Sequence, residues 1–309
     1  MVDAPRPTDD GVERWTLGAN LRADVIAAMS TRVRGEMALV DQGIELHDAH
    51  GEAVAAFSSH LEKIDIGLRI LRANGFRFGG TTADIGSGTG VGATILSRLV
   101  DVRRVYAIDY SDAMVTLTMP AVFRRYGAIQ EKITRVVGDF NAMALPDQHL
   151  DGAVEINSLH HSEDLAATLH EIRRVLKPGA FLLSLERAWP DDVSDAFLES
   201  RLQSELPSHL RQKYAIEEGR AFTREMWGEH EYRRTDWLRA FRRAGFDACL
   251  LRQVHPRWRG LGLNSALNAL SAQTASVRIG GLAYGLGFRR LVVYGLHADT
   301  PLFLCRRRR

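Results

Sequence analysis

The stretch from Ala83 to Ala93, ADIGSGTGVGA, constrains the fold more than any other part of the sequence. An apolar segment typical of a buried strand precedes it, and an apolar segment typical of a helix follows it. Four glycines at alternate positions let the backbone turn sharply and leave no Cβ in the way of a ligand. The following helix presents unpaired N–H groups and the positive end of its dipole to the turn. This stretch therefore predicts a βα turn that binds a nucleotide-like cofactor.

The residues around the turn do not decide between two cofactors. Gly88, Gly90 and Ala93 match the dinucleotide pattern G-x-G-x-x-A. Asp84 precedes the first glycine, and Asp109 ends the next predicted strand, where its carboxylate can accept both hydroxyls of a ribose. A nicotinamide cofactor and S-adenosylmethionine (SAM) would both use such an acid.

Later segments separate these two possibilities. The segments ADIGSGTG, AIDYSDAM, GDFNAMALP, LDGAVEINSLHH and EIRRVLKPGA follow one another from about Thr81 to Leu185. In their order and spacing, the chain resembles the class I SAM-dependent methyltransferases, in particular the small-molecule branch related to ubiquinone and menaquinone methylation. The resemblance implies an enzyme with SAM as its cofactor. A nicotinamide oxidoreductase is disfavoured because it would not need the motif at 138–140 or the Lys-Pro-Gly turn at 177–179.

The alternation of strand and helix patterns predicts an α/β fold. Strands are predicted at 82–85, 104–108, 133–137, 150–157, 181–185 and 248–254, and helices at about 90–99, 112–126, 162–176 and 235–244, the last capped by Thr235. Strands separated by helices indicate a parallel sheet with helices on both faces. The resemblance adds an antiparallel seventh strand, with Leu291–Leu296 as the main candidate and Pro301–Cys305 as the weaker one. We therefore expect a Rossmann-like, seven-stranded, mostly parallel sheet with N-terminal helices and a lid insertion.

Four regions follow from this pattern. Residues 1–79 are expected to be an N-terminal helical region, with disorder over 1–10 and helices within 13–40 and 55–73. Residues 80–189 are the SAM-binding core, 190–234 the lid that contacts substrate, and 235–309 the completion of the sheet. The last region contains an apolar, basic insertion at 255–290.

The resemblance also implies which residues hold the cofactor. The glycine loop would surround the methionine portion, Asp109 would bind the ribose, and residues after the second and third strands would flank the adenine. Met114 could instead be helix core, and Asp139 a turn aspartate. The full predicted set is Asp84, Gly86, Ser87, Gly88, Gly90, Asp109, Tyr110, Met114, Asp139, Phe140 and Asn157.

Two histidines after the fourth strand are the candidate catalytic residues. The pKa of histidine lies close to neutrality, so His160 or His161 could take a proton from an acceptor hydroxyl. Both could instead hold the loop, and Glu155 is a second polar candidate. A polar cluster at 229–232 offers His230 as a rival base if it lines the acceptor site, or forms a solvated face if it does not.

Composition restricts the remaining possibilities. The two cysteines, Cys249 and Cys305, belong to no metal-ligand pattern, so no metal site is predicted, and a reducing cytoplasm is the expected location. No apolar run is long enough to span a membrane. Residues 252–309 carry ten arginines and one acid, a net charge of +9, which indicates a solvated basic tail or contact with an anionic partner.

The sequence thus predicts transfer of a methyl group from SAM to a small-molecule or lipid-linked acceptor, with O-methylation slightly favoured. The acceptor could lie at a membrane surface, as a lipid or a polyprenyl-linked saccharide would, with peripheral contact through 255–309 at the inner face of the membrane. An RNA methyltransferase is a weaker alternative, since the sequence carries no recognised RNA-binding module and nucleic acid is an unlikely partner. A SAM-binding protein without transfer activity is the other alternative. The oligomeric state stays open.

Overall fold

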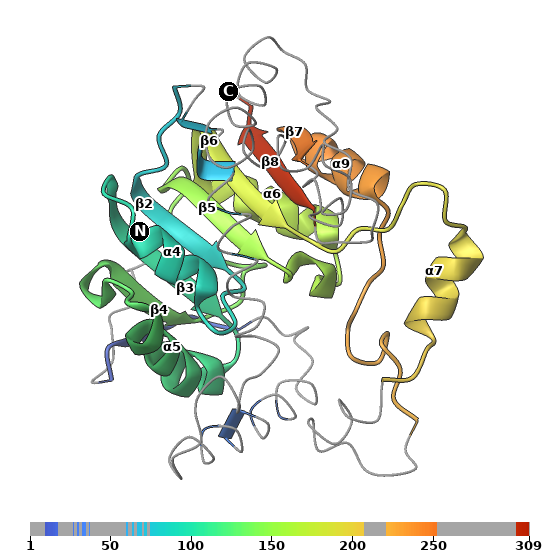
Figure 1. The fold of residues 1–309 in the computed structure, drawn as a ribbon, viewed down its shortest axis with the longest axis horizontal. Helices are drawn as coiled ribbons and strands as arrows, with labels where there is room; N and C mark the ends of the chain where they lie inside the picture. The colour runs from blue at the N-terminus through green and yellow to red at the C-terminus, as the bar shows by residue number, and fades with distance from the viewer. Residues whose placement is uncertain are drawn as a thin grey trace, which may run out of the picture.

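The structure is a computed structural model that describes residues 10–17, 75–206, 221–251 and 301–308, together with isolated residues between 27 and 72. An eight-stranded sheet runs through it (Figure 1). In sheet order the strands are β1 (Val12–Arg14), β4 (Ile133–Val137), β3 (Val102–Asp109), β2 (Gly80–Ile85), β5 (Leu150–Ile156), β6 (Leu176–Leu185), β8 (Leu302–Arg307) and β7 (Phe246–Leu251). Only β8 runs antiparallel to its two neighbours.

Helices cover both faces of the sheet, as the alternating pattern predicts. Apolar side chains of α4 (Val91–Ser97) and α5 (Met119–Tyr126) pack on one face. Those of α6 (Leu165–Val175) and α9 (Arg234–Arg243) pack on the other. Three short helical segments lie between these elements: the π-helix η1 (Met114–Thr118) precedes α5, η2 (Gln130–Lys132) precedes β4, and η3 (Leu159–His161) precedes α6. Helix α7 (Asp195–Leu202) stands apart from the sheet (Figure 1).

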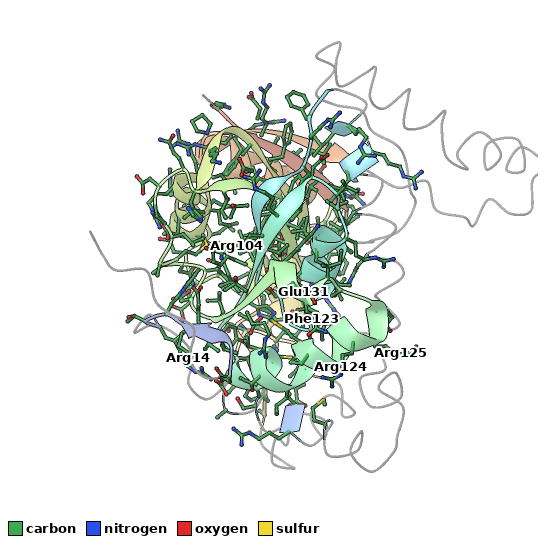
Figure 2. The ribbon with its side chains drawn as sticks, turned by 90° about the vertical axis from the view of Figure 1, so that its left-hand side faces the viewer. Arg14, Arg104, Phe123, Arg124, Arg125 and Glu131 are labelled. Atoms are coloured by element: carbon green, nitrogen blue, oxygen red, sulfur yellow. The ribbon has the colours of Figure 1, made fainter. Side chains whose placement is uncertain are left out.

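One end of the molecule brings α5 against the glycine turn. Figure 2 shows this side, with Phe123 on α5 and with Arg124 and Arg125 in its last turn. Phe123 is buried, and a Cβ at Gly90 would lie 2.5 Å from its ring. The two arginines are exposed at the carboxyl end of the helix, where positive charge is favourable. Packing by α5 therefore requires glycine at position 90.

The N-terminal region contains a strand that sequence patterns do not predict. Val12–Arg14 lies within or beside the segment expected to be helical from residue 13, yet it pairs in parallel with β4. Val12 is fully buried, and Trp15 donates its backbone N–H to Val137. Within the part of the chain that the structure describes, the sheet therefore has eight strands, one more than the seven expected. The described residues at 27–37 and 60–72 are helical, in agreement with the prediction for 13–40 and 55–73.

The antiparallel strand is Leu302–Arg307, so the weaker of the two sequence candidates is correct at this place in the sheet. Leu291–Leu296 lies outside the described residues. Arg306 and Arg307 are consequently part of strand β8. Arg306 lies 4.7 Å above the ring of Phe76, and Arg308 pairs with Asp247 at 3.2 Å. Arg306 and Arg307 therefore belong to strand β8 and not to a separate tail, while the side chain of Arg308 stays half exposed. Contact of this region with an anionic partner stays a prediction.

Two predicted boundaries also differ. Helix α9 begins at Arg234, and its cap is Arg233 rather than Thr235. The backbone N–H of Arg233 donates to the carboxylate of Asp236, three residues on. This hydrogen bond satisfies one backbone N–H at the N-terminus of the helix. Strand β6 starts at Leu176, directly after α6, so Pro178 lies inside a strand instead of in a separate turn.

Strand register places the predicted site at one edge of the sheet. Ile85 pairs with Ile108 on one side and with Glu155 on the other, and Asp109 pairs with Val137. The residues that follow β2, β3, β4 and β5 therefore lie at the same level, beyond the carboxyl ends of parallel strands. Ligands bind at this edge in open α/β sheets.

Candidate functional site

Asp84 fixes the glycine turn to the helix that follows it. Its Oδ2 accepts the backbone N–H of Ala93 at 2.7 Å, in the first turn of α4. A Cβ at Gly92 would lie 2.3 Å from Oδ1 of Asp84, so only glycine allows this approach. Burial raises the pKa of Asp84 to about 7. Asp84 therefore shapes the turn, in keeping with the role expected of it in forming the loop around the cofactor.

Asp109 connects the turn to the next strand. Its Oδ2 accepts the N–H of Gly88 at 2.8 Å, and its Oδ1 accepts the N–H of Ser111 at 2.8 Å. Burial raises its pKa, and these two hydrogen bonds oppose the rise. Gly88 has φ of +51°, and a Cβ there would meet nothing within 4 Å. The tip of the turn is thus open beside a carboxylate that still has unused lone pairs.

Asp139, which follows β4, is buried, and only one of its two carboxylate oxygens accepts hydrogen bonds within the described residues. Both hydrogen bonds that the Asp139 carboxylate accepts within the described residues come from Asn141 and end on Oδ1. Phe140, the next residue, is buried, and its ring lies 3.5 Å from a Cβ placed on Gly86. Asp139 and Phe140 therefore lie at the same edge as the glycine turn.

Asn157 has an unusual backbone directly after β5. Its φ is +53°, a left-handed conformation that few residues other than glycine adopt. Its side-chain Oδ1 is buried and accepts no hydrogen bond within the described residues. Neighbouring Ser158 donates from Oγ to the carbonyl of Ile85, next to the glycine turn. Strain and an unsatisfied oxygen at one residue are features of functional sites.

The remaining cofactor candidates lie close by with different surroundings. Ser87 is buried and donates from Oγ to the carbonyl of Asp84. Tyr110 is half-buried directly after Asp109. Met114 is buried in a small cluster with Val33. That cluster supports the alternative that Met114 is helix core.

His160 lies in a buried network of two carboxyl groups. Its Nδ1 is 2.8 Å from Oε2 of Glu186, and its backbone N–H donates to Oε1 of the same residue at 3.2 Å. Burial lowers the pKa of His160 to about 3, so the imidazole is neutral and donates from Nδ1. Burial also raises the pKa of Glu186 to about 7, and burial with the charge of Glu186 raises that of Glu155 well above its usual range.

His161 faces a segment that arrives from far along the chain. Its Nδ1 lies 3.2 Å from the carbonyl oxygen of Gly228, and its ring centroid lies 4.2 Å from that of His160. One nitrogen from each imidazole and one carboxylate oxygen of Glu229 lie within 4.8 Å of one another. The structure thus assembles a set of atoms able to hold a metal ion, which the sequence analysis did not predict.

The polar cluster at 229–232 packs against these histidines and is not a solvated face. His230 donates its backbone N–H to the carbonyl of His160 at 2.9 Å. Glu229 accepts from Arg187 and from Arg224, at 2.5 Å each, and Glu231 accepts from Trp189 at 2.6 Å. His230 is also held through Nδ1, 3.0 Å from the same carbonyl, which weakens the case for it as a rival base.

Sequence reasoning missed three residues of this site. Glu186 and Arg187 directly follow β6, and their position after a strand was the available signal. Arg224 offered no signal, because no motif links it to Glu229. The role of each of the three depends on its contact in the folded chain: Glu186 with His160, and Arg187 and Arg224 with Glu229.

Comparison with known proteins identifies the domain. Residues 83–184 match the family model described as "Methyltransferase domain". This range runs from the second half of β2 to the end of β6 and includes every predicted site residue from Asp84 to His161.

Curated relatives agree with this match. The sterol 24-C-methyltransferase erg6 of Aspergillus fumigatus is 28% identical over 56% of this chain and 41% of its own length. The ubiquinone/menaquinone biosynthesis C-methyltransferase UbiE of Pseudomonas putida is 31% identical over 39% of this chain and 46% of its own length. The chain thus spans less than half the length of these two relatives.

Among solved structures, the YcgJ protein of Bacillus subtilis covers 79% of this chain at 16% identity, with a TM-score of 0.48. The alignment includes 98% of that protein.

Proposed function

Because residues 83–184 form a class I SAM-dependent methyltransferase domain, we propose that the protein transfers a methyl group from SAM to a small apolar acceptor. The observation that carries this proposal is that Asp109, Asp139 and Asn157 end or follow neighbouring strands at the edge of the sheet where the glycine turn lies, and that Asp109 accepts the N–H of Gly88 in that turn. Each offers an acceptor group at the edge of the sheet where a ligand binds.

The residues at this edge fit SAM. Gly88 leaves open space at the tip of the turn, and Asp109 keeps lone pairs for two ribose hydroxyls. Oδ2 of Asp139 suits the amino group of adenine, and the unsatisfied Oδ1 of Asn157 suits the positively polarised region around the sulfonium. When bound, SAM supplies an electrophilic methyl group. The protein has to align that methyl group with the acceptor atom and exclude water.

The acceptor side lies at η3. His160 and His161 follow Asn157 within four residues, and their Nδ1 atoms are both engaged. Within the described residues, no hydrogen bond engages their Nε2 atoms, whose lone pairs can act on a hydroxyl of the acceptor. Burial lowers the pKa of both imidazoles to about 3, so they are weak bases and would polarise the hydroxyl more than they would hold its proton. Loss of that proton activates a phenol both for attack through oxygen and for attack through the ring carbon. Tyr232 stacks on His230, which donates its backbone N–H to the carbonyl of His160. Trp189 donates its backbone N–H to Tyr232. These aromatic residues favour an aromatic or otherwise apolar acceptor.

The relatives favour methylation at carbon. Their printed names describe sterol 24-C-methylation and quinone C-methylation. The slight preference for O-methylation drawn from the sequence receives no support from them. We therefore favour transfer to a carbon of a hydroxylated ring, with O-methylation as the second product to look for.

A methylation assay with product analysis tests this proposal. The full chain is incubated with SAM and a panel of quinols, phenols and sterols, and products are analysed by mass spectrometry. We expect S-adenosylhomocysteine and a product one methyl group heavier, and fragmentation distinguishes a C-methyl from an O-methyl group. A protein that binds S-adenosylhomocysteine and methylates no acceptor of these classes would support a non-catalytic SAM-binding role.

Contact with a membrane through 255–309 remains a separate proposal. Among the described residues, no helix has both the length and the apolar character needed to cross a bilayer. Most of the basic region lies outside these residues, so the proposal rests on its charge of +9 over 252–309. Flotation of the full chain with anionic and with neutral vesicles tests it. Equal recovery in the unbound fraction with both would exclude docking by charge.

A further inference from the structure

We infer that His160, His161 and Glu229 form a binding site for a divalent transition-metal ion. One donor atom from each residue lies within 4.8 Å of the other two. Two imidazoles and one carboxylate are a ligand set for zinc, iron(II) or cobalt(II) that leaves coordination positions open. This site cannot be predicted from the sequence, because Glu229 lies 68 residues after His161 and no motif links the two.

Hydrogen bonds set both imidazoles in the form that a metal needs. Nδ1 of His160 faces a carboxylate oxygen of Glu186, and Nδ1 of His161 faces the carbonyl oxygen of Gly228. Both partners are acceptors, so each ring carries its proton on Nδ1 and keeps a lone pair on Nε2. A carboxylate or carbonyl behind each histidine is the usual support of a metal ligand.

Two arginines hold the carboxylate of Glu229 through one of its oxygens, and the other oxygen could bind a metal ion. Arg187 and Arg224 both donate to its Oε2, and within the described residues no hydrogen bond reaches Oε1. These two guanidinium groups orient the carboxylate before an ion arrives. The positive charges of Arg187 and Arg224 lower the affinity of the site for a cation. We therefore expect a metal ion to bind reversibly and to exchange with solvent.

Two of the three ligands are only half-buried, so an ion could be reached from solvent. His160 is buried, whereas His161 and Glu229 are half-buried. An ion on these ligands would have its open positions on the side of His161 and Glu229, near the residues that follow Asn157. There it could bind an oxygen of the acceptor and lower the pKa of that hydroxyl. This last step rests on the proposed function, because the Nε2 atoms would then hold the ion instead of taking the proton directly.

Titration with cobalt(II) tests the site without any acceptor. The full chain, freed of metal with a chelator, is titrated with CoCl2 and followed by visible absorption, which reports coordination by nitrogen and oxygen. We expect one equivalent to bind saturably, and His161→Gln and Glu229→Gln each to weaken binding at least tenfold. Glu186→Gln, behind His160, should weaken it about 10- to 100-fold. His170→Ala, on the exposed face of α6, is the matched control and should bind as the unchanged protein does.

Absence of saturable binding to the unchanged protein would overturn the inference. Unchanged affinity in both His161→Gln and Glu229→Gln would also overturn it. Titration of every sample with S-adenosylhomocysteine checks folding and keeps the two proposals apart. If S-adenosylhomocysteine binds and cobalt does not, only the metal site fails. If the unchanged protein does not bind S-adenosylhomocysteine, the proposed function fails instead.

Discussion

The imidazole of His160 and the carboxylate of Glu186 lie 2.8 Å apart in the interior, each nearly or fully excluded from solvent. The first belongs to the loop after β5, and the second follows β6. Because burial keeps the imidazole neutral, this contact is a hydrogen bond from Nδ1–H to a carboxylate, and it fixes which nitrogen faces the site.

Replacing Glu186 by glutamine should therefore reduce turnover without loss of cofactor binding. The amide keeps the shape of the carboxylate but no longer stabilises positive charge on His160, so we expect kcat to fall about tenfold or more. The affinity for S-adenosylhomocysteine, measured by calorimetry, should stay within about twofold. Loss of both together would mean that Glu186 only supports the fold. Glu163→Gln, on the exposed turn before α6, is a control that should change neither quantity.

Asp109 should be required for cofactor affinity. It accepts from Gly88 and Ser111 and is the residue proposed to bind the ribose. Asp109→Ala should weaken S-adenosylhomocysteine binding at least tenfold, about 1.4 kcal/mol or more. Asp112→Ala, three residues on, removes a half-exposed carboxylate that pairs with Arg14 and serves as the control. Equal affinity in the Asp109 variant and the unchanged protein would remove Asp109 from the site.

Gly92 should tolerate no side chain, because a Cβ would lie 2.3 Å from the Asp84 carboxylate. Gly92→Ala should destabilise the protein by about 1–3 kcal/mol through overpacking, and weaken cofactor binding by shifting α4. Chemical denaturation measures the first effect. Gly75→Ala is the comparison: it has open space around its Cβ and a φ of +78°, so only backbone strain of about 1–2 kcal/mol opposes it. A Gly92 variant as stable as the unchanged protein would show that α4 does not depend on this contact.

The buried Asp84 should make stability depend on pH. Its pKa rises to about 7 in the folded chain, against about 4 when unfolded. The folded state thus holds one more proton between these values. The resulting contribution to stability is complete below about pH 4 and is lost as the pH rises through 7, by at most about 1.4 kcal/mol per pH unit.

Asp84→Asn should remove this dependence, since an amide does not titrate. Urea unfolding at pH 5, 6, 7 and 8 is the measurement, and the difference between the two proteins isolates Asp84. The variant should gain stability relative to the unchanged protein as the pH rises. Parallel curves for the two would contradict the raised pKa.

Most strands of the sheet could be predicted from the sequence, but β1 could not, and β8 was only the weaker of two candidates. Strands such as Ile133–Val137, which is rich in β-branched residues and lies between predicted helices, could be predicted, and the structure confirms them. Val12–Arg14 has only three residues, too few to show the alternation of buried and exposed side chains that marks a strand. It forms a strand because it pairs with β4. Leu302–Arg307 ends in arginines that suggest a tail, and its place in the sheet comes from its two neighbours, β6 and β7.

The same division holds for the site. Gly88 and Asp109 sit in local motifs, so their proximity could be predicted, and the structure joins them through one hydrogen bond. Glu186 and Glu229 lie 26 and 69 residues from His160. No spacing encodes those contacts, which depend on how β6 and the segment before α9 return to η3. The acceptor side is therefore visible only in the folded chain.

Calorimetric titration of the full chain with S-adenosylhomocysteine, with NADH as the control, tests the central claim most directly. The account predicts one S-adenosylhomocysteine bound per chain with micromolar affinity, and no heat from NADH. Tight binding of NADH, or no binding of S-adenosylhomocysteine, would contradict the assignment of the edge formed by Asp109, Asp139 and Asn157 as a SAM site.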